Sequence, residues 1–129
     1  ASVMKRSTCG VFPSRAEGWN LELLEMMSCG KPVIATVYSA HTEFCNENNS
    51  LLIDIDSLET ASDGKWFKGD LGEWASLEGN PFDSLVGHFR TVYASWKEGV
   101  VENPAGIQTA IAFSWDQTAK KIKEAMYEG

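Results

Sequence analysis

The sequence predicts an α/β fold in which a partial parallel sheet of about three strands carries flanking helices and a helical carboxyl-terminal region. Short apolar runs alternate with helix-patterned and turn-rich segments over residues 1–55. The last third of the chain has helical spacing instead. Of the 129 residues, 43% are apolar and five are Trp, enough for the core of one domain.

The bounds of the first strand and helix are indicated by residues that typically begin or end secondary structure. Cys9–Phe12 is an apolar run that Pro13 stops, which is typical of a buried strand. Asn20 suits the N-cap of a helix that runs to about Cys29. Gly30 fits the left-handed position just past that helix. We therefore expect a strand, a loop and a helix in this order.

Two further strands follow. The run PVIAT begins at Pro32, which cannot extend the helix. Residues 38–49 are polar and loop-like, with about one helical turn around 42–45. Leu51–Ile53 is a third short apolar run. Strands separated by helical segments favour a parallel sheet with covering helices.

The middle of the chain gives a weak signal. Residues 54–81 are rich in Gly, Asp and Ser and have no clear period. We interpret them as an irregular, insertion-like but ordered loop. Trp66, Phe67 and Trp74 form a small core beneath this loop or, alternatively, line a surface for an acceptor or partner.

Three helices are expected in the remainder. Apolar residues have helical spacing over 83–97, and Pro104 suits the first turn of a short helix to about residue 112. Ser114 caps the last helix, which lies in the closing segment 113–128. We interpret residues 1–129 as a single, truncated domain.

Charge and cysteine content exclude some function classes. The net charge of −7 and the pI of about 4.7 argue against a nucleic acid or an anionic membrane as partner. A nucleotide ligand is compatible, because a few backbone amides can hold its diphosphate. Three widely spaced Cys and two His predict free thiols and no metal site or cofactor. We expect a cytoplasmic location and leave open a peripheral membrane association of the parent protein.

The segment 10–36 holds the candidate site. Glu17 lies in a loop after the first strand, and Glu25 lies in the helix that follows. The start of a helix at the carboxyl edge of a parallel sheet binds anions, so a diphosphate can meet the amides of Gly18–Leu21. Carboxylates accept hydrogen bonds from sugar or ribose hydroxyls. From spacing alone, Glu17 is equally well a solvated acid, and the helical wheel does not rank Glu25 above Glu22.

The motif closely resembles the signature of glycosyltransferase family 4, which has a twin-Rossmann (glycosyltransferase-B) architecture. The matching residues are Pro13-Ser14, Glu17-Gly18-Trp19-Asn20-Leu21, Glu25 and the run CGKPVIAT at 29–36. A weaker likeness covers FSWDQTAKKI at 113–122. The resemblance implies a Rossmann-like, carboxyl-terminal donor-binding domain.

The resemblance also implies a site and a reaction. Glu17 is the candidate catalytic residue and contacts the donor sugar, while Glu25 holds the ribose of a nucleotide diphosphate sugar. The implied donor-binding residues are Glu17, Gly18, Trp19, Asn20, Leu21 and Glu25. The parent enzyme would move a hexosyl group, with retention of configuration, to a sugar or glycan acceptor. Family members often have a very small residue at the position of Asn20, so its side chain narrows the sugar pocket or supplies a hydrogen bond.

The same resemblance leads us to expect that this chain alone is inactive. The family's diphosphate-binding Arg and Lys, and its acceptor-binding domain, precede the position of Ala1. An incomplete sheet would also expose an edge that favours self-association. Two alternatives stay open, namely a twin-Rossmann epimerase or phosphorylase and a non-catalytic binding or assembly module.

Three side chains near the motif receive less weight. Arg15 and Lys31 are interpreted as solvated charges rather than phosphate ligands. His41 follows the second strand at the same edge of the sheet, but we favour a role for it away from the nucleotide.

Overall fold

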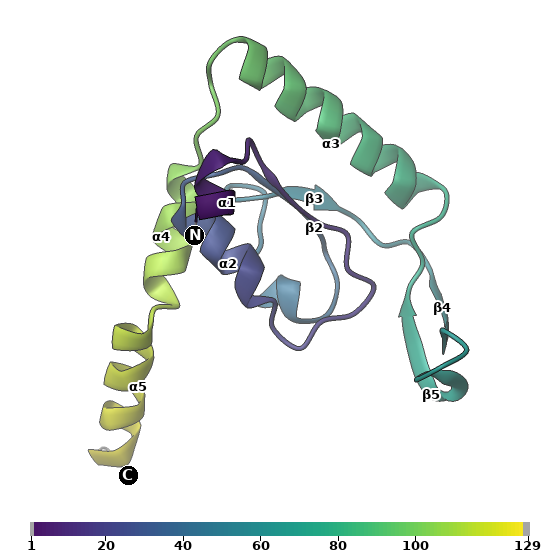
Figure 1. The fold of residues 1–129 in the computed structure, drawn as a ribbon. Helices are drawn as coiled ribbons and strands as arrows, with labels where there is room; N and C mark the ends of the chain where they lie inside the picture. The colour runs from purple at the N-terminus through teal and green to yellow at the C-terminus, as the bar shows by residue number, and fades with distance from the viewer. Residues whose placement is uncertain (1, 128–129) are drawn as a thin grey trace.

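The computed structural model describes residues 2–127 (Figure 1). Its elements, in chain order, are α1 (Ser2–Arg6), β1 (Gly10–Phe12), α2 (Leu21–Ser28), β2 (Val33–Thr36), the 3-10 helix η1 (Ser39–Glu43), β3 (Leu51–Ile53), β4 (Leu58–Ser62), β5 (Lys68–Ala75), α3 (Asn80–Lys97), α4 (Pro104–Ala112) and α5 (Trp115–Tyr127).

The central sheet has three parallel strands in the order β1-β2-β3. Gly10 is opposite Val33 in the first pair, and Thr36 is opposite Ile53 in the second. α2 connects β1 to β2, and η1 lies between β2 and β3. The α/β class, the parallel strands and the flanking helices predicted from the sequence are thus confirmed, in an arrangement consistent with a partial Rossmann-like fold.

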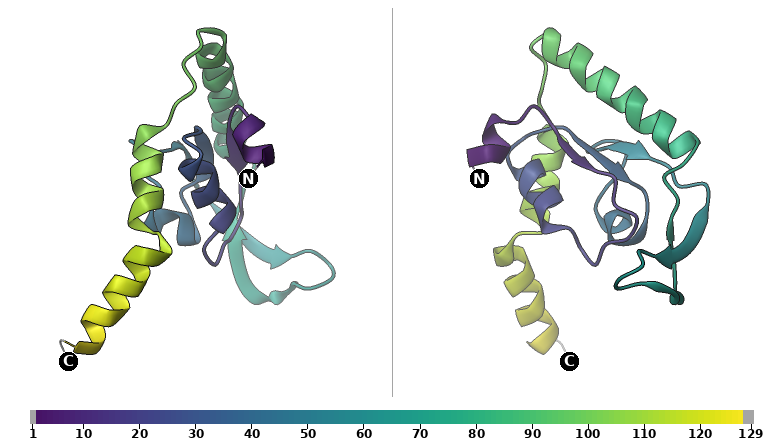
Figure 2. Two further views of the ribbon diagram at one scale, coloured as in Figure 1. Left: turned by 60° about the vertical axis from the view of Figure 1, so that its left-hand side comes forward. Right: turned by 45° about the vertical axis from the view of Figure 1, so that its right-hand side comes forward.

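Helices cover both faces of this sheet. The four residues of β2 are all buried, and alternate side chains point to opposite faces. Val33 and Ala35 pack with the apolar side of α2, and Ile34 packs with Ile53 and with Val92 of α3. α4 lies against α2, so one face carries α2 and α4 while the other carries α3 (Figures 1 and 2).

α2 begins and ends where the sequence predicts. The Oδ1 atom of Asn20 accepts from the N–H of Leu23 at 3.2 Å and so caps the helix. Gly30 has φ of 68° and donates its N–H to the carbonyl of Met27 at 2.8 Å, which closes the carboxyl end. The side chain of Leu21, the first residue of α2, is 57% exposed, whereas those of Leu23, Leu24, Met26 and Met27 are buried.

Residues 54–81 contain regular structure, which corrects the irregular loop expected there. β4 and β5 form an antiparallel hairpin with an irregularity between Thr60 and Ser62. Most hairpin residues are exposed on both faces, so no apolar alternation marks the strands. Its tip is held by Asp63, whose Oδ1 atom accepts from the N–H groups of Lys65, Trp66 and Phe67 at 2.7 to 2.9 Å.

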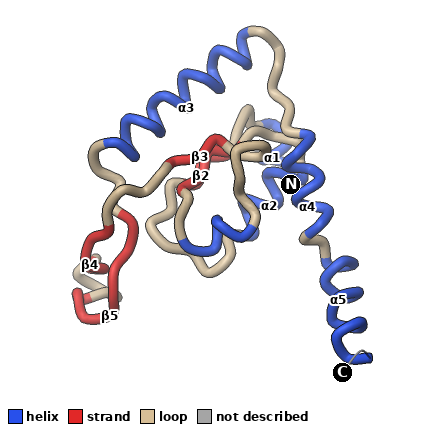
Figure 3. Tube along the Cα trace, turned by 180° about the vertical axis from the view of Figure 1, so that it is seen from behind, coloured by secondary structure: helices blue, strands red, loops and turns tan. Residues whose placement is uncertain are grey.

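The expected aromatic core of this segment is only partly present. The rings of Phe67 and Trp74 pack edge to face with centroids 5.5 Å apart. Trp66 is 72% exposed and takes no part in that pair. The hairpin and α5 extend from the core in different directions (Figures 2 and 3).

The other helices differ from expectation mainly at their ends. α1 was not predicted. α3 begins at Asn80 rather than residue 83, and Pro81 occupies its first turn. α4 spans the expected residues. α5 contains no buried residue and ends at Tyr127, while Glu128 of the predicted closing helix lies outside the described residues.

Asn103, the N-cap of α4, ties the carboxyl-terminal half to the core. Its Nδ2 atom donates to the carbonyls of Lys31 at 3.2 Å and Asn49 at 2.9 Å. Its Oδ1 atom accepts from the N–H of Gly106 at 2.8 Å. A Cβ atom on Gly106 would lie only 2.4 Å from Nδ2 of Asn103, so the close approach requires glycine. The Asn103 side chain therefore fixes α4 beside the α2–β2 turn.

Among the helices of residues 2–127, none combines the length and apolar character that crossing a bilayer requires.

Candidate functional site

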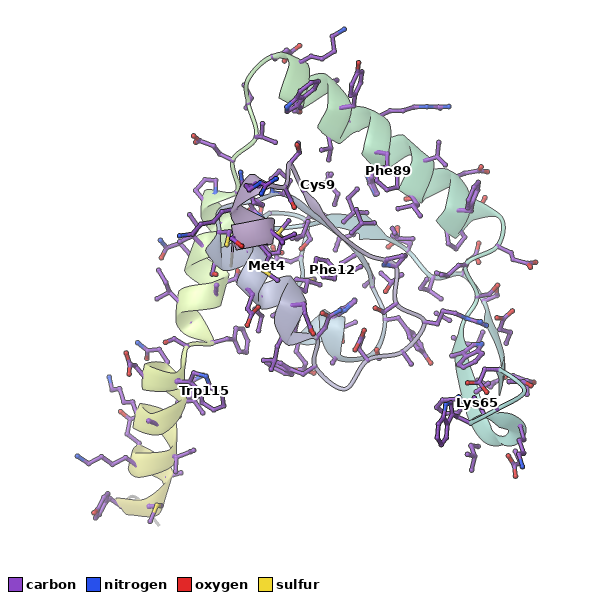
Figure 4. The ribbon with its side chains drawn as sticks, in the orientation of Figure 1. Met4, Cys9, Phe12, Lys65, Phe89 and Trp115 are labelled. Carbon is purple, nitrogen blue, oxygen red and sulfur yellow. The ribbon has the colours of Figure 1, made fainter. Side chains whose placement is uncertain are left out.

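The candidate site lies where β1 and β2 end, at the carboxyl edge of the parallel sheet. Phe12, labelled in Figure 4, is the last residue of β1 and leads into the loop that contains Glu17. The hydroxyl of Thr36 at the end of β2 donates to the carbonyl of Ser14 at 2.7 Å. The N–H of Glu17 donates to the hydroxyl oxygen of Ser39 at 2.8 Å. Two loops from different strands are thus joined into one structure.

The two oxygens of the Glu17 carboxylate have different environments. Oε1 accepts from the hydroxyl of Ser14 at 2.7 Å and from Nδ2 of Asn20 at 3.3 Å. Within residues 2–127, Oε2 has no hydrogen-bond donor. The side chain is half-buried. A carboxylate held in this way has one free oxygen that accepts hydrogen bonds from a ligand.

His41 supports this arrangement from beneath. Its side chain is fully buried, with Nδ1 3.1 Å from the carbonyl oxygen of Thr36 and Nε2 2.9 Å from Nδ2 of Asn20. Because a carbonyl only accepts, we assign the proton to Nδ1, which leaves Nε2 to accept from the Asn20 amide.

The direction of the pKa shift of His41 agrees with a neutral ring that carries its proton on Nδ1. Burial lowers the pKa of His41 from its usual value, while the hydrogen bond to the Thr36 carbonyl and the negative charge of Glu17 oppose the change. The ring is therefore neutral near pH 7. From the sequence we favoured a role for His41 away from the nucleotide. The structure places its ring in contact with Asn20, and its position in the segment after β2 was the available signal.

Backbone strain is concentrated in the same network. Among the non-glycine residues in 2–127, Asn20 and Ser39 are those with positive φ, at 71° and 51°. Such a conformation costs an L-residue about 1–2 kcal/mol. Both residues use their side chains to hold the loop around Glu17, through Nδ2 of Asn20 and Oγ of Ser39. Strain that is maintained by specific contacts often marks a binding or catalytic site.

The backbone next to Glu17 is open. In the described chain, the N–H groups of residues 18–21 have no acceptor. Gly18 is exposed, and a Cβ atom placed on it would meet nothing within 4 Å. No backbone conformation or packing contact thus requires glycine at this position, and the amides are accessible to an anion at the start of α2.

Trp19 contributes differently from its neighbours. Its ring packs against Phe44 at 5.3 Å and Phe113 at 5.5 Å between centroids. The side chain therefore anchors the loop to the core, while the backbone N–H of Trp19 remains open to a ligand. Phe113, from the segment with the weaker motif, is thereby in contact with the main motif.

Glu25 lies outside the network around Glu17. Both Glu25 and Glu22 are exposed on α2. No hydrogen bond in the described chain joins either carboxylate to Glu17, Asn20 or His41. The structure therefore leaves Glu22 and Glu25, both exposed on α2, equally available to a ligand.

The two nearest cations do not point to a phosphate. Arg15 forms an ion pair with Glu59, donates from Nε to the carbonyl of Ala75 at 3.1 Å and lies 4.0 Å from the centre of the Trp74 ring. It connects the Glu17 loop to the hairpin and is not the solvated charge expected from the sequence. Lys31 precedes β2 and so lies at the opposite edge of the sheet.

Across residues 2–127, no group of three or more His, Cys, Asp and Glu side chains is arranged to hold a metal ion.

The comparisons with known proteins bear on the first half of the chain. Residues 1–63 match the family model of glycosyl transferases group 1. This range includes the whole network around Glu17. No curated protein and no solved structure matched the chain.

Proposed function

From this family match, which supports a glycosyltransferase-type function in general, we propose a more specific role. The chain is the donor-binding part of a retaining glycosyltransferase of family 4. It binds a nucleotide diphosphate sugar whose hexosyl group passes to a sugar or glycan acceptor. The retaining stereochemistry follows from the resemblance alone.

One observation carries the proposal. The carboxylate of Glu17 presents one free oxygen beside a run of open amides at the start of α2. An acceptor for sugar hydroxyls and donors for a diphosphate are thus adjacent, which is the combination that a nucleotide sugar requires.

The roles of the individual residues follow from this combination. Glu17 accepts from hydroxyls of the donor sugar and supports the positive charge that develops at the sugar carbon. The backbone N–H groups of residues 18–21 meet the sugar and diphosphate oxygens. Glu25, further along α2, accepts from the ribose diol. The structure adds that the Asn20 side chain supplies no free donor, since it is engaged by Leu23, His41 and Glu17.

Binding of the chain to nucleotide sugars tests the proposal. Isothermal titration calorimetry with UDP-glucose and GDP-mannose should show saturable binding to at least one of them. Glu17→Gln should weaken binding about tenfold, because a charge-assisted hydrogen bond becomes a neutral one. If the chain bound neither UDP-glucose nor GDP-mannose, the proposal would be overturned.

A matched pair of substitutions tests the role of Glu25. Glu25→Ala and Glu22→Ala remove equal charges from exposed positions of the same helix. We expect a roughly tenfold loss of affinity for the first and less than a twofold loss for the second. Equal losses of affinity in the two variants would contradict a specific role of Glu25 in ribose binding.

A further inference from the structure

The contacts around Glu17 also bear on the chemical class of the sugar. Oε1 is occupied by Ser14 and Asn20, so only Oε2 faces a ligand. The Asn20 amide has no free N–H group with which to donate a hydrogen bond to a ligand. Its two N–H bonds are directed to Glu17 and His41, and its oxygen accepts from the N–H of Leu23. At this point the site therefore presents an acceptor with a negative charge.

Within residues 2–127, Glu17 takes part in no ion pair. Arg15, two residues away, is engaged by Glu59 and stacked on Trp74. Lys31 lies at the other edge of the sheet. A neutral sugar can donate its hydroxyl hydrogens to Oε2. A sugar that carries a carboxylate brings a second negative charge and, at neutral pH, no proton in that group to donate.

We propose that His41 and Asn20 hold Glu17 so that the site accepts an uncharged, hydroxyl-bearing sugar and rejects a sugar that carries a carboxylate. This inference rests on the proposed function, because it assumes that the sugar of a nucleotide sugar meets Glu17. His41 acts as a positioning residue. Its neutral Nε2 atom fixes the Asn20 amide, and that amide occupies Oε1 and directs Oε2 outward.

The position of His41 within the fold makes it suitable for this task. It is fully buried and fixed at Nδ1 by the carbonyl of Thr36, so its ring cannot rotate to follow the Asn20 amide. Asn20 in turn is held in the left-handed region with φ of 71°. The direction of the Glu17 carboxylate is therefore set by the Ser14 hydroxyl together with a series of hydrogen bonds that begins at the end of β2.

Calorimetric titration of matched ligands tests the inference. UDP-glucose is compared with UDP-glucuronate, and GDP-mannose with GDP-mannuronate, since each pair differs only at C6. We expect the neutral member of the pair that binds to be favoured at least tenfold, because a second negative charge close to the Glu17 carboxylate is repelled. The preference should decrease as NaCl is raised.

The Glu17→Gln variant shows where the preference originates. It removes the charge while keeping the size of the side chain, so the neutral and acidic sugars should bind within about threefold of one another. Glu22→Gln is the matched control, because it makes the same change in net charge at an exposed position of α2. It should keep the full preference. Loss of preference in Glu22→Gln would overturn the inference in favour of a general charge effect.

Two substitutions at His41 separate positioning from stability. In the His41→Gln variant, the amide oxygen of the new side chain can replace Nε2 as the acceptor for the Asn20 amide. In the His41→Asn variant, the shorter side chain can replace only Nδ1, the donor to the Thr36 carbonyl. Both should lower the thermal unfolding temperature. His41→Gln should keep most of the preference for the neutral sugar, and His41→Asn should reduce it, because Glu17 keeps its charge but is then held by Ser14 alone. Equal preference in the two variants would refute the positioning role.

The outcomes distinguish this inference from the function on which it rests. Binding of both members of a pair with equal affinity refutes the sugar preference and leaves the donor-binding function standing. Binding of no member of either pair refutes both.

Discussion

The guanidinium carbon of Arg15 lies 4.0 Å from the centre of the Trp74 ring, and this contact fastens the β4–β5 hairpin to the loop that holds Glu17. The same side chain is paired with Glu59 on the neighbouring strand. In the other direction, the N–H of Ala75 donates to the carbonyl of Arg15 at 2.9 Å. The hairpin is thus attached to the candidate site at its base, while its tip is exposed.

Removal of Arg15 should therefore loosen the hairpin. We expect Arg15→Ala to accelerate amide hydrogen exchange over residues 58–75 and to lower the free energy of unfolding by about 1 kcal/mol, since both the stacking and the exposed ion pair are modest contributions. Lys65→Ala is the control, because Lys65 also lies over an indole ring, 5.2 Å from the Trp66 centre, but at the tip. Unchanged exchange in Arg15→Ala would contradict this account.

Asn20 permits a test of backbone strain at the site. Asn20→Ala removes the helix cap and leaves an alanine in the left-handed region, so unfolding should become easier by about 2 kcal/mol. Asn20→Gly removes the same side-chain contacts but tolerates φ of 71°, and its cost should be about half as large. Chemical denaturation of the two variants measures the difference. A glycine variant less stable than the alanine variant would argue against strain at this residue.

His41 should make stability depend on pH. Its pKa is lowered in the folded state, mainly by burial and against the opposing charge of Glu17, so the unfolded chain binds the proton more readily. The contribution of the neutral ring is fully present above its unfolded pKa of about 6.5 and is lost as pH falls through the interval below that value. Plotted against pH, the free energies of unfolding of the wild type and of His41→Gln, from urea denaturation, should stay separated by a constant amount above pH 6.5 and approach one another below it. Parallel curves would show that His41 is not responsible.

Asn103 should be among the most sensitive polar residues of the chain. Replacement by Ala leaves the carbonyls of Lys31 and Asn49 and the N–H of Gly106 without this partner, so unfolding should become easier by about 2–4 kcal/mol. Asn48→Ala, at an exposed position, should change stability by less than about 0.5 kcal/mol. Thermal or urea denaturation compares them. Similar stability of the two variants would contradict the bridging role.

The outer edge of β1 should allow the chain to associate with itself. Within residues 2–127, β1 pairs with β2 alone, and Gly10 donates to the carbonyl of Pro32 on that side. The backbone groups of Val11 therefore point the other way. We expect sedimentation velocity to show dimers at high protein concentration. Hydrogen exchange of the Val11 amide should be slower at that concentration than in dilute solution. Exchange that does not depend on concentration would exclude pairing through this edge.

The sequence was most informative where local chemistry decides the structure. Asn20 and Gly30 marked the ends of α2 because capping and left-handed termination depend on a few adjacent residues. The apolar run 33–36 indicated the central strand because apolar side chains are stabilised by burial in the core. The hairpin was missed because strands exposed on both faces lack a periodic apolar pattern.

The contacts of the candidate site were less accessible to sequence reasoning. The position of Glu17 followed from the motif, but its network depends on Ser39 and His41, which reach it from the loop after β2. Arg15 was expected to be solvated because its partners, Glu59 and Trp74, lie more than 40 residues away in a segment without a recognisable pattern. Pairings of this kind arise from the folded arrangement and not from the local sequence.

Every side-chain hydrogen bond of Glu17, Asn20 and His41 is made with residues between Ser14 and His41. The site is thus encoded by one uninterrupted stretch of the gene. The hairpin, α3 and α5 contribute no partner to these side-chain bonds. The stretch lies wholly within residues 1–63, the part of the chain that matches the family model.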